Sequence, residues 1–294
     1  MKRIITLFCM AAATAATAQT KVVTQAVITT KTTTVSPEGS EDMAPPPPPS
    51  GDGGEQRVTF RFGGDGETKT VTTLKGDMVK TYTENEMSRI TTLRDNAKKT
   101  TTTLMEMMGK KTGVVATDED QAAAAKKLDS MMQSRSQNGG GNFNFSSNTV
   151  TASDIAYTEE SKKIAGLQCK KALVINTRKN GNKDTTVVWY CPDFKLQGLV
   201  STGGTSGFGG FGARLTGLSG LDNLAGFPMQ YEMKLNRGRK MIVEVTKITL
   251  DKEVSDKEFE ISKDFELKSM KDMQNGGGPG MMFRFGGPGG GGGQ

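Results

Sequence analysis

Four low-complexity segments rich in glycine, proline, asparagine or serine divide this 294-residue chain. They are residues 36–56, 134–148, 198–220 and 276–294. Such compositions lack the apolar side chains that a packed core needs, and Pro45 to Pro49 favour an extended polyproline II spacer. We therefore expect one domain of about 180 residues, the usual domain size. The first segment is predicted to be a linker insert, the second a flexible linker, the third a glycine-rich loop and the fourth a disordered tail.

The N-terminus has the pattern of a secretory signal. Lys2 and Arg3 precede an apolar stretch over residues 4–16, and Ala16-Thr17-Ala18 has the small-x-small pattern that signal peptidase cleaves. We predict that residues 1–18 are a signal peptide; a buried N-terminal helix is the alternative. The stretch is shorter than the roughly 20 residues that span a membrane, and no later stretch approaches that length. The sequence thus predicts an exported protein without a transmembrane span, in the periplasm, associated with the outer membrane, or extracellular.

Between the low-complexity segments the pattern is mostly that of β-strands. Residues 19–35 are rich in Val, Ile, Thr and Lys and predict a first strand. Residues 57–133 predict an antiparallel meander followed by a helix, because short β-prone runs recur between turn residues. Residues 149–275 predict the second half of the same domain. Within them Met229, Tyr231, Met233 and Leu235 alternate with polar residues, so one face of that strand should lie on a core.

One helix interrupts the strands. Thr117 and Asp120 have the spacing of a capping box, in which each residue bonds the other at the start of a helix. Ala124, Leu128, Met131 and Met132 then fall on one stripe. We expect this helix to lie against the sheet, and the fold class to be mainly β (α+β).

The composition excludes most catalytic chemistry. The chain has no His, so it cannot form a Ser-His-Asp or Cys-His nucleophile or a His-ligated metal site. Its three Cys cannot make a four-thiolate zinc site, and its net charge of +6 is too small and dispersed to indicate nucleic-acid binding. Carboxylates are numerous but lie among lysines, as on solvated faces. We predict a non-enzymatic protein without metal or cofactor, with a paired-carboxylate hydrolase as the enzymatic alternative.

The two cysteines of the predicted mature chain flank a turn signal. Asn180 lies midway between Cys169 and Cys191, in the sequence Lys179-Asn180-Gly181-Asn182. In a hairpin turning there, the cysteines face each other to within one residue of register. Directly opposed residues lie within reach of a disulfide, and an oxidising compartment favours one. We predict a cross-strand disulfide; two free thiols or a redox-active pair remain as alternatives.

Soft apolar side chains are abundant outside the predicted signal. The chain has 17 Met, and methionine fills irregular or changing cavities well. Aromatic and leucine residues recur in and after the third low-complexity segment, where they suggest a mobile flap over an apolar pocket. The predicted ligand-binding residues are Phe208, Phe211, Leu215, Leu218, Leu221, Leu224, Met229, Tyr231, Met233 and Leu235. The alternative is that these residues complete an ordinary core.

A five-residue sequence occurs twice. Phe60-Arg61-Phe62-Gly63-Gly64 is repeated as Phe283-Arg284-Phe285-Gly286-Gly287. Each copy places two aromatic rings beside a cation on a flexible tether, so both are candidates for docking on a sheet edge or a partner. Low-complexity drift is the alternative origin of the repeat.

Several blocks in the second half resemble a known family. They are residues 162–172 (KKIAGLQCKKA), Val188-Trp189-Tyr190, Gly226-Phe227-Pro228, and Val254-Ser255-Asp256 followed by Phe259. In this order they resemble an uncharacterised family of secreted Gram-negative bacterial proteins, over residues 157–267. That family is similar in strand pattern to LolA/LolB-type lipoprotein carriers, whose fold is a half-open antiparallel β-barrel with helices covering its concave face.

The resemblance implies a specific architecture and function. One or two helices, near Leu128 and Leu221, would cover the concave face of a half-open antiparallel β-barrel. The leading hypothesis is that this face binds an acyl chain, lipid or lipidated peptide, with a lipid or lipoprotein as partner. The alternative is an envelope structural or protein-interaction module with a filled core, which contacts an envelope protein through the glycine-rich tail.

Overall fold

The computed structural model describes residues 20–37, 66–84, 88–137, 150–197, 220–234 and 238–275. Most of these residues lie in β-strands. The N-terminal strands are β1 (Lys21–Val23), β2 (Gln25–Val35), β3 (Gly66–Lys75), β4 (Met78–Glu84), β5 (Ser88–Asp95), β6 (Thr100–Met107) and β7 (Lys110–Thr117). The later strands are β8 (Val150–Ile164), β9 (Leu167–Arg178), β10 (Lys183–Cys191), β11 (Phe194–Leu196), β12 (Phe227–Lys234), β13 (Lys240–Leu250) and β14 (Glu266–Ser269). The helices are α1 (Asp118–Gln137), α2 (Met270–Asn275) and the short 3₁₀ helices η4 (Leu221–Asn223) and η6 (Asp256–Phe259).

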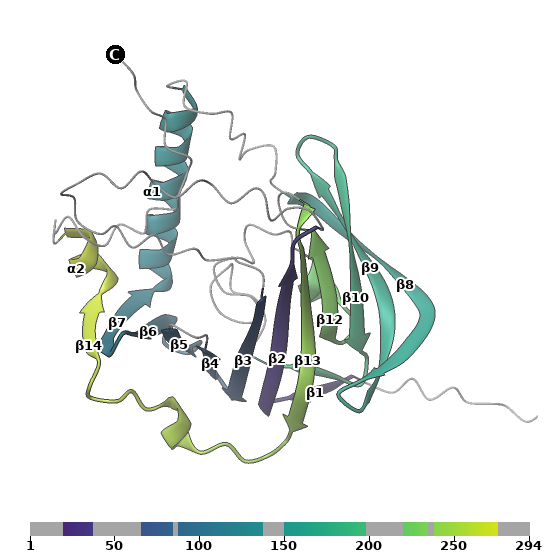
Figure 1. Cartoon of the computed structure of the whole chain (residues 1–294), viewed down its shortest axis with the longest axis horizontal. Helices are drawn as coiled ribbons and strands as arrows, with labels where there is room; N and C mark the ends of the chain where they lie inside the picture. The colour runs from purple at the N-terminus through teal and green to yellow at the C-terminus, as the bar shows by residue number, and fades with distance from the viewer. Residues whose placement is uncertain are drawn as a thin grey trace, which may run out of the picture.

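Twelve strands form one large sheet in the order β14-β7-β6-β5-β4-β3-β2-β13-β12-β10-β9-β8. All its neighbouring strands are antiparallel except β14 and β7. The sheet is strongly curved and stays open, with β8 at one end and β14 at the other (Figure 1). The prediction of a mainly β, half-open barrel is therefore confirmed. The short parallel pairs β14–β7 and β1–β11 are an addition that the meander pattern did not predict.

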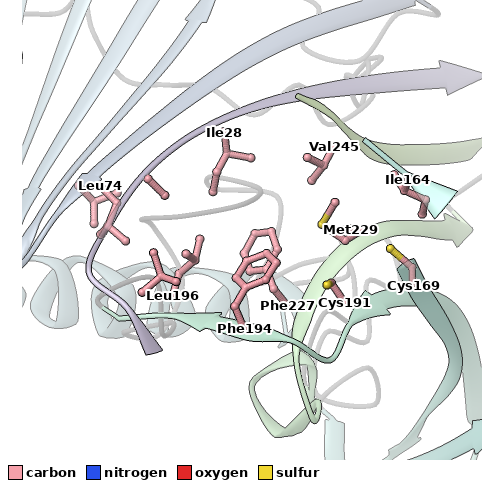
Figure 2. Close-up of a cluster of buried hydrophobic side chains, with 13 residues drawn as sticks. Ile28, Leu74, Ile164, Cys169, Cys191, Phe194, Leu196, Phe227, Met229 and Val245 are labelled. Atoms are coloured by element: carbon pink, nitrogen blue, oxygen red, sulfur yellow. The ribbon is translucent and has the colours of Figure 1, made fainter. Parts of the chain in front are cut away.

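The core consists of two packed clusters of apolar side chains. The first joins β2, β3, β4 and β13 to the ends of β8, β9, β10 and β12, and includes Phe194 and Leu196 of β11. Figure 2 shows Ile28, Met229, Phe194 and both cysteines pointing into it. The rings of Phe194 and Phe227 stack with centroids 5.3 Å apart. The second cluster fills the neighbouring part of β9, β10, β12 and β13, where Tyr231 and Leu224 are fully buried.

The predicted capping box is confirmed at the start of α1. The Thr117 amide donates to Asp120 Oδ2 at 3.1 Å, and the Asp120 amide donates to Thr117 Oγ1 at 3.1 Å. The helix begins directly after β7, contacts that strand and rises from its end (Figure 1). It continues to Gln137, four residues past the predicted end at 133, because nothing in the sequence after Met132 breaks the helix before Gly139.

The C-terminal segment returns across the outside of the meander. Lys75 Nζ lies 2.6 Å from Asp256 and Lys80 Nζ lies 3.2 Å from Glu258, so η6 is held beside β4. β14 then joins the edge of β7 in parallel. This path brings α2 beside the start of α1, where Lys271 Nζ lies 3.4 Å from Asp120 Oδ1.

Several predictions lie outside the described residues. They concern the signal peptide, the tail, most of the proline-rich insert, most of the 134–148 linker, nearly all of the 198–220 loop and both copies of the Phe-Arg-Phe-Gly-Gly sequence.

Candidate functional site

The inner face of the β3–β6 meander is defined by strand register. Directly paired residues point to the same side of a sheet, as do residues two apart along a strand. Leu74, Val79, Arg94 and Thr101 are paired in succession across these four strands and are all buried. Leu74 and Val79 belong to the first core cluster. This buried row therefore forms one end of the inner face, and we call it the base row.

Two further rows lie beyond the base row on the same face. The first row consists of four threonines paired directly in succession, and the second mixes threonine with apolar residues. They are Thr72, Thr81, Thr92 and Thr103, then Thr70, Thr83, Ile90 and Met105. Except for the buried Thr72, these eight side chains are half-buried. We call them the threonine-lined face. Each threonine presents a methyl and a hydroxyl, so this face offers apolar contact and hydrogen bonding together.

Arg94 supplies a positive charge at the base of this face, but its guanidinium is already paired. Its Nη2 donates to Asp118 Oδ2 at 2.9 Å, its Nη1 donates to Asp118 Oδ1 and to Thr101 Oγ1, and its Nε donates to Asn96 Oδ1 at 3.0 Å. These hydrogen bonds from Arg94 lower the pKa of Asp118. The pair between buried Arg94 and partly exposed Asp118 holds the first turn of α1 beside the inner face. The eight residues of the threonine-lined face are themselves uncharged.

The described part of the predicted ligand site lies inside the core clusters. Met229 belongs to the first cluster, and Leu224, Tyr231 and Met233 belong to the second; each is at most 2% exposed. Burial raises the pKa of Tyr231. Leu221, in η4, packs at the edge of the second cluster. The predicted alternation of β12 is thus confirmed, and these side chains are surrounded as core residues are. Their contact with a ligand stays a prediction.

The other half of that predicted site lies outside the described residues. It comprises Phe208, Phe211, Leu215, Leu218 and Leu235. The threonine-lined face was not predicted from the sequence. The available signal was the placement of threonines at alternate positions in consecutive strands, such as Thr70 and Thr72 in β3 and Thr81 and Thr83 in β4.

The cysteine pair lies where the hairpin predicts it. β9 and β10 pair without a register shift, and Tyr190 is opposite Lys170, so the next position sets Cys191 opposite Cys169. The Arg178 amide donates to the Asn182 carbonyl at 2.8 Å in the same register. Hydrogen-bonded and non-hydrogen-bonded pairs alternate along an antiparallel ladder. Counting from Arg178 and Asn182, the Cys169–Cys191 pair is a non-hydrogen-bonded pair, in which Cα atoms are about 4.5 Å apart. This separation is within the range for a disulfide.

Both sulfurs are fully buried free thiols in the structure. Burial and the neighbouring Cys191 raise the pKa of the Cys169 thiol to about 11, and burial also raises that of Cys191. A thiol held neutral in this way is a poor nucleophile. The geometry suits a structural cross-link better than redox catalysis, and the disulfide itself stays a prediction.

No helix within the described residues has the length and apolar content needed to cross a bilayer. No group of three or more Cys, Asp or Glu side chains among them is placed to hold a metal ion.

Comparisons with known proteins give distant likenesses. No protein-family model and no curated protein sequence matches the chain. Two crystal forms of PNGF-II align at 14% identity with TM-scores of 0.36 and 0.35, over 85% of this chain and 32% and 33% of theirs. A putative outer membrane lipoprotein-sorting protein domain from Vibrio parahaemolyticus aligns at 8% identity and a TM-score of 0.17, over 80% of this chain and 88% of that one. This chain therefore spans about a third of the PNGF-II length, and the function has to be argued from geometry.

Proposed function

We propose that this is an exported, non-enzymatic protein that binds an amphiphile with an acyl chain, such as a lipid or a lipidated peptide, on the inner face of its half-open barrel. The observation that carries the proposal is the threonine-lined face. Its rows continue directly from a buried base row, apolar at Leu74 and Val79, into half-buried methyl and hydroxyl groups. An acyl chain gains about 0.8 kcal/mol per buried methylene, and the hydroxyls can satisfy its ester or amide groups.

The packing of the two halves supports a ligand position on the meander. Core clusters fill the inner side of β12 and β13, so Tyr231 and Met233 already have apolar neighbours. The meander side instead presents Thr92, Thr103 and Met105 half-buried beside the start of α1. We therefore assign ligand contact to β4–β6 first, and to the predicted residues of β12 only where the ligand reaches the clusters.

The experiment compares matched variants on the two faces of the same strands. Thr92→Glu and Thr103→Glu place a carboxylate on the inner face, whereas Thr91→Glu and Thr102→Glu place one on the outer face, one residue away. All four threonines are half-buried, so the two pairs are similar in stability cost. Binding is measured with a fluorescent fatty acid after delipidation, and native mass spectrometry reports co-purified lipid.

We expect the inner-face variants to weaken binding at least tenfold and the outer-face variants to leave it nearly unchanged. Equal effects from both pairs, or a wild-type protein that neither co-purifies with lipid nor binds the probe, would reject the proposal.

A second candidate function follows from the filled clusters themselves. An envelope structural or interaction module needs a packed interior, which the second half of the domain has. In that case the tail makes the contacts. Deleting residues 276–294 would then abolish partner capture, and the probe would not bind either the full-length or the truncated protein.

A further inference from the structure

Strand β8 forms one end of the large sheet and pairs only with β9 among the described strands. It is 15 residues long, and its side chains are mostly exposed. Near its C-terminal end it reads Glu159-Glu160-Ser161-Lys162-Lys163. A strand at a sheet edge presents unpaired N–H and C=O groups, which are a template for another strand.

The register identifies which backbone groups point away from the sheet. Because Arg178 bonds Asn182 across the β9–β10 hairpin, the even-numbered residues of β9 direct their N–H and C=O groups toward β10. The odd-numbered residues, including Leu167 and Cys169, direct theirs toward Ile164 and Lys162 of β8. Ser161 and Lys163 therefore direct their N–H and C=O groups to the edge of β8 that is unpaired among the described strands.

A bulge interrupts β8 just before Ser161. Between Tyr157 and Ser161 four steps along β8 match two steps along β9, so two residues are extra. Within the bulge the Thr158 hydroxyl donates to the Lys171 carbonyl at 3.3 Å. Glu159 lies inside the bulge and its side chain is exposed, so it contributes its charge, while the backbone phase rests on Ser161 and Lys163.

The charge order of this segment is self-complementary in the antiparallel direction. If a second copy pairs antiparallel about Ser161, Glu159 lies opposite Lys163 of the second copy, and Glu160 lies opposite Lys162. Each pair occurs twice by symmetry. A parallel arrangement in register would instead place like charges together, which is destabilising.

We propose that two copies of this protein associate through β8, antiparallel about Ser161, so that one continuous sheet runs through both. The backbone groups of Ser161 and Lys163 make the inter-strand hydrogen bonds, and the paired charges fix direction and register. This association is independent of the ligand on the inner face.

Charge-swap variants at the exposed positions 159 and 163 test the interface. Glu160 and Lys162 are left unchanged because they contact their own sheet: Lys171 lies 2.7 Å from Glu160, and Lys162 Nζ lies 4.3 Å from the ring centroid of Trp189. Glu159→Lys and Lys163→Glu each replace two attractive pairs by two repulsive ones. Lys179→Glu is the control, since it makes the same charge change at an exposed position in the β9–β10 turn.

Sedimentation velocity over a concentration series gives the association state, and circular dichroism reports folding. We expect dimers for the wild type and Lys179→Glu, and association weakened about tenfold or more for each single variant. An equimolar mixture of the two single variants should form heterodimers, and the double variant Glu159→Lys/Lys163→Glu should again form homodimers. A wild type that stays monomeric, or single variants that associate as the wild type does, would overturn the proposal; so would a mixture that fails to associate.

Discussion

Loss of the predicted disulfide between Cys169 and Cys191 should lower the unfolding free energy by about 3 kcal/mol. The bond would close the segment from Cys169 to Cys191, and the chain-entropy relation for a loop of about 20 residues gives this magnitude at 25 °C. Serine at a fully buried site adds the cost of burying a hydroxyl, about 1–3 kcal/mol if it finds no partner. The comparison of oxidised with reduced wild type therefore isolates the cross-link, and Cys169→Ser and Cys191→Ser report the sum.

The assay is urea unfolding of these four samples followed by circular dichroism. Mass spectrometry establishes the oxidation state, since the bonded form is two hydrogens lighter. We expect the oxidised wild type to have the highest midpoint, the reduced wild type a lower one, and the two serine variants the lowest. The same midpoint for oxidised and reduced wild type would refute the reasoning, as would a protein that forms no intramolecular bond after oxidative refolding.

Two further predictions concern ionisable groups. The pKa of the Cys169 thiol is raised to about 11, so the folded protein holds this proton more tightly than the unfolded chain does. The reduced protein should therefore keep this stabilisation at pH values below the ordinary thiol pKa of about 8.5 and lose it as the pH rises toward 11. Urea unfolding at a series of pH values measures the loss, which should be smaller for Cys169→Ser. Asp118→Asn should destabilise the protein by about 1–3 kcal/mol, near the lower value because this side chain is 38% exposed. Thermal unfolding measures that loss, and faster amide exchange in the first turn of α1 should accompany it; unchanged exchange there would contradict a role for Asp118 in holding the helix.

Local signals in the sequence predicted the elements well. The capping-box spacing of Thr117 and Asp120 located the start of α1, because the bonds that define it involve residues three apart. The Asn180-Gly181 turn located the β9–β10 hairpin and set the cysteines opposite each other. The alternation of β12 identified its buried face, because successive side chains of a strand point to opposite faces of the sheet and only one of those faces is covered.

Local sequence patterns did not predict the contacts between distant parts of the chain. β14 pairs with β7 although more than 140 residues separate them, and Leu267 packs where Gly113 leaves room. A Cβ at position 113 would lie 2.4 Å from Leu267 Cδ2, so this glycine permits the contact, yet no local pattern marks it. The threonine-lined face was missed for a related reason. Threonine is neutral in a hydropathy pattern, and only register across four strands assembles its residues into rows.

The uneven distribution of apolar burial has a consequence for the ligand. Both clusters draw most of their side chains from β8–β13, whereas the β3–β6 meander contributes Leu74 and Val79 to them. The outer face carries buried Leu93 and Leu104 together with exposed ion pairs, such as Lys75 with Asp256, that contribute about 0–1 kcal/mol each. The inner face of the meander therefore has less apolar packing than the inner face of β9–β13, and a ligand there adds apolar contact. Binding of a fatty acid should slow amide exchange in β4–β6 more than in β9–β12, whereas equal protection of both halves, or protection confined to β12, would place the ligand elsewhere.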